Sequence, residues 1–429
     1  MEFVSAYNTF FYSFFAGGLK DFFLLILPFA WFWLPPILFL ILWHTYRHYT
    51  LKKYLADTKW ITLEIKVPRE VTKSPQAMEL ALAAFHQTSD KTWYDRTFSG
   101  YVRPWFSLEM VSIGGVVRFF VRTPAFFKNF IESSMYAQYP EVEIYETEDY
   151  VSGIPSNVGQ DDSEWELWAA ELELTKADPY PIRTYIDYGL DRDPKEEFKN
   201  DPLGTLIEFL GSLKPDEQVW IQILIQATKK RFPKTGGPKG FWGNTKHLFG
   251  FREKQDWQAE GAALLDKIMK RNEKPKPGEF KFNTLSSSED LVAKAIARSI
   301  AKQGFDCGIR AVYTAKKDIF NKIRVVGTLT SFKQFSSMDL NGFKPKRTTA
   351  PFDYPWQDPF GTRTARIKKR LFRAYRERGY FYIPYKIKPF VLNTEELATI
   401  FHFPGRAVET PTLGRIESRR GEPPSNLPL

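Results

Sequence analysis

The chain has a single cysteine, Cys307, in 429 residues. One cysteine cannot form an intrachain disulfide, and such scarcity is typical of proteins that fold in a reducing compartment. Cys307 lies in an apolar stretch with the pattern of a strand, where a cysteine more often fills space in a core than acts as a nucleophile. We therefore expect neither a disulfide framework nor a cysteine-based active site.

Motifs for nucleotide hydrolysis, metal binding and acyl transfer are also missing. The chain has no Gly-Lys dipeptide and therefore no phosphate-binding loop of the P-loop type. The five histidines are scattered, apart from His44 and His48, and there is no Gly-x-Ser-x-Gly motif. The sequence predicts a protein that is not an enzyme and that needs no cofactor and no metal.

Positive charge exceeds negative charge, with a net charge of +10. Acidic residues predominate between residues 141 and 217, whereas basic residues predominate at 229–281 and 363–388. A basic balance favours anionic surroundings such as nucleic acid or a membrane surface. The acidic and basic segments could equally pair with each other, within one chain or between subunits.

A long uncharged stretch lies near the N-terminus. Residues 22–43, FFLLILPFAWFWLPPILFLILW, contain no charged side chain. At about 1.5 Å per residue, a helix of this length crosses a hydrocarbon core of about 30 Å. Basic residues are rare before the stretch and frequent after it, so the positive-inside rule places the N-terminus outside and the remainder in the cytoplasm. We therefore predict a single-pass anchor in the cytoplasmic (inner) membrane.

Two series of strands and helices follow the anchor. Strand-like alternation, helix caps and the Gly114-Gly115 turn predict the order β-α-β-β-α-β over residues 60–148, which is that of a ferredoxin-like sandwich. A second unit of the same kind begins near Trp165, with strands expected at 166–176, 180–187 and 218–228. A stretch rich in Gly, Pro and Lys interrupts this unit.

The predicted fold class is α+β: a transmembrane helix, two ferredoxin-like units and a C-terminal helical and extended tail. The predicted parts are an anchor with a juxtamembrane segment (1–59), a first domain (60–150), a second domain with a basic insertion at 229–281 (151–345), a basic helix and a capped helix (346–404) and a Pro-rich tail (405–429).

The basic helix is the first candidate binding surface. TARIKKRLFRAYRERGYF places Ile367, Leu371 and Tyr375 on one stripe and surrounds it with cations. Such a helix binds nucleic-acid phosphates, lies on anionic lipid, or pairs with the acidic segment. The candidate contact residues are Lys368, Lys369, Arg370, Arg373, Arg376 and Arg378 of this helix, with Lys229, Lys230 and Arg231 of the insertion.

The segment FVLNTEELATIFHFPGR is the second candidate. Thr394 can cap a short helix, and Glu395 and Glu396 then lie in its first turn, where the helix dipole favours negative charge. We interpret it as a capped element that docks a partner, with the candidate residues Thr394, Glu395, Glu396, Leu397, Ile400, Phe401 and His402.

Several of these stretches resemble a known family. LEIKVPREVTKSPQAMELALAAFH, SLEMVSIGGVVRFFVRTP, YAQYPEVEI, DPLGTLIEFLGSLKPDEQVWIQILI and FVLNTEELATIFHFP look like the membrane-anchored N-terminal region of TraG/TraD-like coupling ATPases of bacterial type IV secretion and conjugative DNA transfer. In that family a P-loop motor follows the segment that here reads FHFP. This sequence has no such motor, and no catalytic residue is carried over.

The resemblance implies a non-enzymatic, membrane-anchored scaffold that positions a transfer ATPase at the cytoplasmic face of the membrane. The expected partners are the lipid bilayer, a separate P-loop ATPase, and further copies of the chain or DNA. The alternative is a membrane-tethered nucleic-acid-binding protein that uses the basic helix at 363–379 and the insertion at 229–281.

Overall fold

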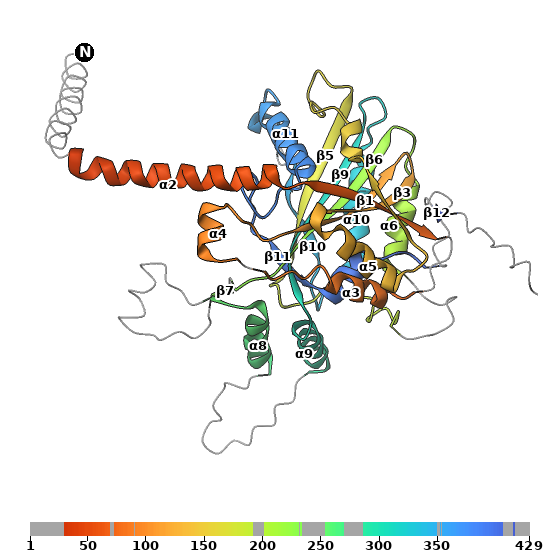
Figure 1. Cartoon of the computed structure of the whole chain (residues 1–429). Helices are drawn as coiled ribbons and strands as arrows, with labels where there is room; N and C mark the ends of the chain where they lie inside the picture. The colour runs from red at the N-terminus through yellow and green to blue at the C-terminus, as the bar shows by residue number, and fades with distance from the viewer. Residues whose placement is uncertain are drawn as a thin grey trace, which may run out of the picture. The chain divides into compact units, whose positions relative to one another are not determined.

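The computed structural model describes residues 30–68, 73–89, 91–191, 201–230, 232–233, 254–269, 286–349, 352, 354–405 and 415–416. The chain divides into two compact units. The first unit comprises residues 1–58 and 90–102, and the second comprises residues 59–89 and 103–429. Figure 1 labels many of their helices and strands.

The first unit contains two described helices, α2 (Ala30–Asp57) and α4 (Trp93–Phe98). α2 includes the later part of the expected membrane span, whereas residues 22–29 of that span lie outside the described residues. Within the part of the chain that the structure describes, no helix combines the length and the apolar character needed to cross a bilayer.

The first half of the second unit has the predicted order of elements. Its strands pair antiparallel in the order β4-β1-β3-β2. Gly114 and Gly115 connect β2 to β3 with φ angles of 59° and 88°, which a tight hairpin turn requires and which side chains disfavour. The elements are β1 (Trp60–Pro68), α3 (Pro75–Ala83), β2 (Phe106–Ile113), β3 (Val116–Pro124), α5 (Lys128–Gln138) and β4 (Glu143–Thr147).

The second half repeats this pairing with other residues, in the order β10-β5-β9-β6. Its main elements are β5 (Trp165–Leu174), α6 (Pro202–Gly211), β6 (Glu217–Ala227), β9 (Gly304–Lys316), α10 (Lys322–Thr330) and β10 (Phe343–Thr348). Between β6 and β9 lie β7 (Phe232–Pro233), β8 (Lys254–Gln255), α8 (Trp257–Ile268) and α9 (Ser287–Ile300). Short 3-10 helices occupy Ala125–Phe127, Tyr150–Gly153, Ser331–Phe335 and Pro355–Gln357.

The strand predicted at 180–187 is wrong. These residues form a loop and turns, with a hydrogen bond from Asp187 N to the carbonyl of Thr184. Their backbone groups find side-chain partners instead of a neighbouring strand, because Ile182 N donates to Glu396 and Tyr185 N donates to Thr399.

The two halves join into one sheet. β2 and β6 pair antiparallel, from Phe106 opposite Ile225 to Ile113 opposite Gln218. Outward from this central pair, the strands of each half follow in the same order. Apolar side chains from both halves also form a single core. The boundary predicted between residues 150 and 151 therefore does not separate two independently packed domains.

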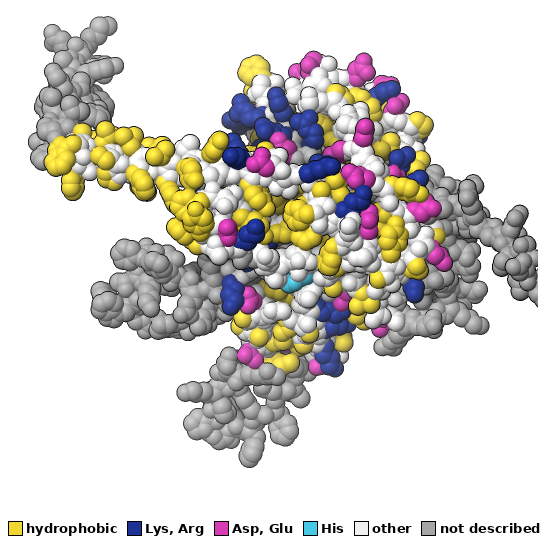
Figure 2. Space-filling model, in the orientation of Figure 1, with side chains coloured by type: hydrophobic (Ala, Val, Ile, Leu, Met, Phe, Trp, Pro, Cys, Tyr) yellow, Lys and Arg dark blue, Asp and Glu magenta, His cyan; other side chains and the backbone are white. Residues whose placement is uncertain are grey.

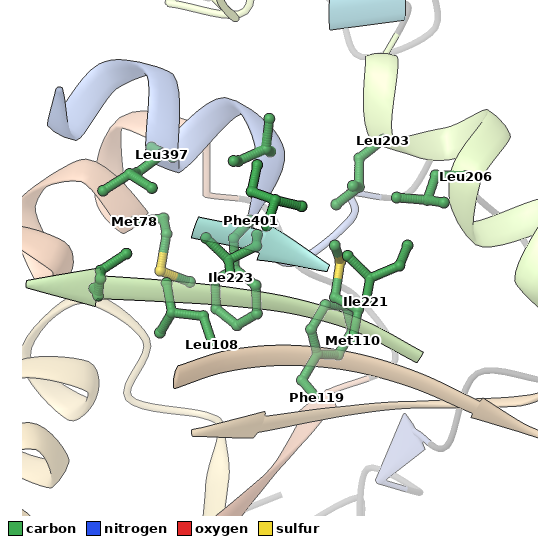
Figure 3. Close-up of a cluster of buried hydrophobic side chains, with 14 of the residues drawn as sticks. Met78, Leu108, Met110, Phe119, Leu203, Leu206, Ile221, Ile223, Leu397 and Phe401 are labelled. Atoms are coloured by element: carbon green, nitrogen blue, oxygen red, sulfur yellow. The ribbon is translucent and has the colours of Figure 1, made fainter. Parts of the chain in front are cut away.

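One face of the sheet carries that core. Side chains at alternate strand positions, such as Leu108 and Ile223, pack against α3, α5, α6 and α12 (Thr394–Ile400). Figure 3 shows this layer, with Met78 of α3, Leu203 of α6 and Leu397 of α12 meeting the strands. The opposite face carries a row of polar side chains beside apolar ones such as Trp220, and α11 (Thr362–Arg376), the blue helix of Figure 1, packs on it.

The part predicted at residues 346–404, a basic helix and a capped helix, is not separate from the rest of the fold. β11 (Phe390–Asn393) pairs with β9, and α12 enters the core. β12 (Arg415–Ile416) pairs parallel with β1, and the other residues of the predicted Pro-rich tail after Gly405 lie outside the described residues.

Candidate nucleic-acid interface

Helix α11 is amphipathic, and its apolar side faces the sheet. Leu371, Phe372, Ala374 and Tyr375 are buried. The indole of Trp220 on β6 packs against the rings of Phe372 and Tyr375, at centroid distances of 6.5 and 5.2 Å. Because residues three or four apart share one side of a helix, this packing turns most of the basic residues outward.

A row of polar side chains on the sheet holds the C-terminal end of α11. Glu171, Arg310, Gln222 and Glu109 lie opposite one another on β5, β9, β6 and β2. Arg310 donates to Glu171 Oε1 at 2.9 Å, to Gln222 Oε1 at 3.2 Å and to the carbonyl of Ala374 at 3.0 Å. This contact is favourable because the carbonyl end of a helix carries partial negative charge.

Arg378, just after α11, completes this attachment. Its guanidinium donates to both carboxylate oxygens of Glu109 at 2.9 Å and to Asp149 Oδ1 at 3.0 Å. Burial raises the pKa of Glu109. The charge of Arg378 and the hydrogen bonds from Arg378, Ser107 and Tyr150 lower it by more than burial raises it, so the pKa falls to about 2. Glu109 and Arg378 are therefore both charged, and they fix the end of α11 on the sheet.

The exposed side of α11 is strongly basic. Its cations recur at helical spacing and include Arg363, Arg366, Lys369, Arg370, Arg373 and Arg376, all exposed. In Figure 2 dark-blue side chains gather over α11. Arg373 forms an ion pair of 2.7 Å with Glu377. We call these six residues the basic face of α11.

The structure divides the predicted contact residues of this helix. Lys369, Arg370, Arg373 and Arg376 belong to the basic face, but Lys368 turns toward the sheet and pairs with Glu166 at 2.6 Å. The prediction of Arg378 as a surface contact is wrong, because acidic side chains surround its buried guanidinium. For these two residues the structure favours the alternative in which basic and acidic segments of one chain pair.

A groove of about 410 Å³ separates α11 from β10. Arg370 lies over the ring of Tyr385, 5.2 Å from its centroid. Burial, together with the negative charge of Glu171, raises the pKa of Tyr385 to about 12, so its phenol is neutral at physiological pH. The groove lining combines cations with apolar groups and consists of Lys346, Arg347, Thr348, Ile367, Arg370, Leu371 and Tyr385.

Exposed aromatic rings precede α11. Tyr354 and Trp356 stack with their centroids 4.6 Å apart and their planes inclined by 10°. Trp356 is 72% exposed and Phe360 is 87% exposed. Asp358 accepts a hydrogen bond of 2.7 Å from Thr364 N and so ties this segment to the first turn of α11. Exposed rings beside a basic surface suit the bases and phosphates of single-stranded nucleic acid.

The predicted contacts of the insertion lie elsewhere. Lys229 and Lys230 follow the last residue of β6, while Arg231 and most of residues 229–281 lie outside the described residues. Lys368 of α11 pairs with Glu166, which lies in register with the first residue of β6. Because a strand rises about 3.3 Å per residue, the length of β6 separates the two basic segments by roughly 30 Å.

The predicted docking segment lies in the core. Its candidate residues are all buried, namely Thr394, Glu395, Glu396, Leu397, Ile400, Phe401 and His402. Asn393, rather than Thr394, is the N-cap of α12 and forms a capping box with Glu396. The interpretation of these residues as a surface for a partner is therefore wrong, since they pack against α3 and the sheet.

The charged groups of this segment make internal contacts. Glu395 forms an ion pair of 2.9 Å with Lys302. His402 contacts Asp201 Oδ2 through Nε2 at 3.1 Å and the carbonyl of Ala398 through Nδ1 at 2.9 Å. Burial lowers the pKa of His402, but the charge of Asp201 and the hydrogen bonds to Asp201, Ala398 and Thr399 together raise it more, so the net shift is upward. Asp201 also caps α6, so this pair links two helices of the core.

Among the described residues, no group of three His, Cys, Asp or Glu side chains is placed to hold a metal ion. Cys307 is buried in β9.

A model of a family described as a domain of unknown function, DUF8128, matches residues 48–415. No curated protein matches the chain. The matched region includes both halves of the sheet, α11 and α12.

Proposed function

The chain belongs to the DUF8128 family, and we propose that it is a membrane-tethered protein that binds single-stranded nucleic acid through the basic face of α11. The orientation of α11 carries this proposal: its apolar side is packed on the sheet, and its cations project into solvent. Lys and Arg side chains that neutralise phosphates supply much of the affinity for nucleic acid.

The same orientation argues against α11 lying on a membrane. A helix that binds the membrane surface inserts its apolar side into the acyl region. In α11 that side is occupied, since Leu371, Phe372 and Tyr375 are buried in the protein. Phosphates that approach the basic face need no such insertion.

The aromatic groups favour single strands over duplexes. Tyr354, Trp356 and the ring of Tyr385 flank the basic face, and bases of a single strand are free to stack on such rings. Stacking on a protein ring contributes about 1–3 kcal/mol per base and tolerates any sequence. The proposed ligand is therefore a single strand bound with little sequence preference.

The proposed attachment to the membrane rests on the side chains of α2. Large apolar side chains from Trp31 to Leu42 are exposed, and Arg47, Lys52 and Lys53 follow them. Exposed apolar surface of this extent is unusual in water. The excess of basic residues after the apolar stretch supports an inner-membrane location with residues 59–429 in the cytoplasm.

A salt titration tests the proposal. Affinity of the full chain in detergent for a fluorescent single strand should fall steeply with salt, and the slope should decrease by about 0.7 for each phosphate contact removed. The triple variant Lys369→Ala, Arg370→Ala, Arg373→Ala should flatten this slope. The matched control replaces three exposed lysines of other helices, Lys267, Lys294 and Lys322. Equal slopes for the triple variant and the wild type would refute the proposal.

The scaffold role implied by the resemblance is a second proposal. It cannot use the buried residues of α12, but Ile323 and Val326 of α10 are exposed beside a groove that Phe209 and Ile319 also line. Exposed apolar side chains beside a groove are typical of surfaces that a protein partner covers. Purification from detergent extracts should recover a P-loop ATPase with the wild type but not with Ile323→Asp, and absence of the ATPase in both would count against this role.

A further inference from the structure

In the first unit, the type of exposed side chain changes along α2. The first part of the helix exposes large apolar side chains at successive positions, namely Trp31, Phe32, Trp33, Leu34, Ile37, Leu38, Phe39, Leu40, Ile41 and Leu42. These positions lie on all sides of the helix, because successive residues are rotated by about 100°. Such a surface differs from that of an amphipathic helix, which buries one side only.

The character of α2 changes after Leu42. Aromatic residues and histidines come next, with Trp43, Tyr46 and Tyr49 and the first cation, Arg47, among them, and Lys52 and Lys53 follow one turn later. Apolar, aromatic and basic residues occur in this order where a helix leaves the acyl region and passes the headgroups toward the cytoplasm. The aromatic stretch of α2 therefore marks the level of the membrane surface.

Helix α4 meets α2 at this level. The ring of Phe98 lies 6.0 Å from Trp43 and 6.4 Å from Tyr46, measured between centroids. Gly100, with a φ of 67°, lies against Thr50, where an added Cβ would be 2.2 Å from the Thr50 carbonyl oxygen. These contacts set the position of α4 along α2.

α4 also exposes aromatic side chains. Trp93 is 64% exposed and Tyr94 is 62% exposed, although both rings touch Phe98 at 5.9 and 4.9 Å. Trp and Tyr are enriched at membrane surfaces, because their rings prefer the apolar side and their polar atoms prefer the headgroups. A water-exposed position gives these rings no such environment.

We propose that α4 lies in the headgroup region of the membrane beside α2, with Trp93 and Tyr94 inserted among the lipids. This inference rests on the proposed tether. It adds a second lipid contact, separated from α2 by more than thirty residues of sequence, which holds the first unit at a defined depth. The occupant of this aromatic surface is therefore lipid, rather than a protein.

Depth-dependent quenching tests the proposal in the full chain. Cysteines introduced as Tyr94→Cys, Phe39→Cys and Met338→Cys would carry an environment-sensitive dye, since the native Cys307 is buried. Met338, 98% exposed and in the second unit, is the control for a solvent position. The labelled protein would be reconstituted in vesicles whose lipids carry a spin label either at the headgroup or in the middle of the acyl chain.

The dye at position 94 should lose more fluorescence to the headgroup label, and the dye at 39 should lose more to the mid-chain label. The dye at 338 should lose fluorescence to neither. If position 39 is quenched and position 94 is not, α4 does not contact lipid and only the tether stands. If neither is quenched, the tether fails as well. Shielding of position 94 that depends on the protein-to-lipid ratio would assign its surface to a second copy of the chain and overturn the proposal.

Discussion

Arg378 binds both carboxylate oxygens of Glu109 at 2.9 Å, although the two residues are 269 positions apart in the sequence. Glu109 lies near the middle of the β2–β6 pairing, where the two halves of the sheet meet. Arg378 directly follows α11. This pair therefore fastens the helix that carries the basic face to the centre of the sheet.

Breaking the pair should destabilise the fold strongly. Arg378→Ala leaves the buried Glu109 without its counter-charge, and loss of one partner of a buried ion pair costs about 3–5 kcal/mol. The free energy of unfolding in urea, measured for the full chain in detergent, reports this change. Arg373→Ala is the matched control, because its exposed pair with Glu377 contributes only about 0.3–0.5 kcal/mol. Similar losses for the two variants would contradict the buried pairing.

The same site offers a compensating change. Replacing both partners, as Glu109→Gln with Arg378→Met, removes the two charges together and should recover part of the stability lost in Arg378→Ala. The comparison uses the same urea titration. A double variant that is less stable than Arg378→Ala would show that other contacts of Glu109 dominate.

Stability should fall as the pH rises from about 6 to 9. Folding raises the pKa of His402, so its protonation stabilises the fold below the unfolded value near 6.5, and this contribution is lost as the pH passes the higher folded value. Burial raises the pKa of Glu396 to about 8, above the 4.5 of an unfolded glutamate, so the stability that Glu396 contributes also falls as the pH rises between these two values. Thermal unfolding followed by tryptophan fluorescence measures the profile. Asp201→Asn should make it shallower, and a profile that rises over this range would contradict the assignment.

A methyl group added at Gly308 should destabilise the packing on the face of the sheet that carries α11. An added Cβ would lie 2.3 Å from the ring of Tyr380, which packs over β9. Gly308→Ala forces this ring to move, at a cost of about 1–3 kcal/mol. Gly153→Ala is the control, since nothing lies within 4 Å of its added Cβ. Equal thermal midpoints for both variants would contradict the close packing of Tyr380.

Loss of an aromatic ring and loss of a cation should have different effects on nucleic-acid binding. Trp356→Ala should weaken single-strand binding by about 1–3 kcal/mol, because a ring contact does not depend on counterions, and should leave the salt slope unchanged. Lys369→Ala should instead reduce the slope. Fluorescence anisotropy at several salt concentrations measures both quantities. A change in slope for Trp356→Ala would indicate that the variant disturbs the basic face itself.

Local patterns predicted the order of the elements. The Gly114-Gly115 turn and the order of strands and helices over residues 60–148 depend on neighbours in the sequence, and both appear in the structure. The repeat in the second half could be predicted only in part, because residues 180–187 form a loop and turns instead of the expected strand. The pairing of β2 with β6 could not, because it joins residues about one hundred positions apart.

The candidate sites show a similar limit. Helical spacing predicted the exposed Lys369 and Arg373, and the same spacing also marks Arg363 and Arg366, which the prediction left out. It could not distinguish Arg378, which a left-handed φ of 49° directs into the sheet. Glu395 and Glu396 were wrongly predicted to lie on a docking surface, because charged side chains are usually exposed. Here they are buried, and partners from distant segments of the chain contact them.

The central pairing of β2 with β6 also determines how the chain can be shortened. A fragment that ends near residue 150 would leave β2 as an edge strand, with the backbone groups that now bond to β6 open to other chains. Unprotected edges of this kind promote aggregation. Soluble fragments should therefore keep both halves of the sheet together. They should be shortened within the connection between β6 and β9, where a replacement loop removes the short β7–β8 pair but leaves every strand of the large sheet paired.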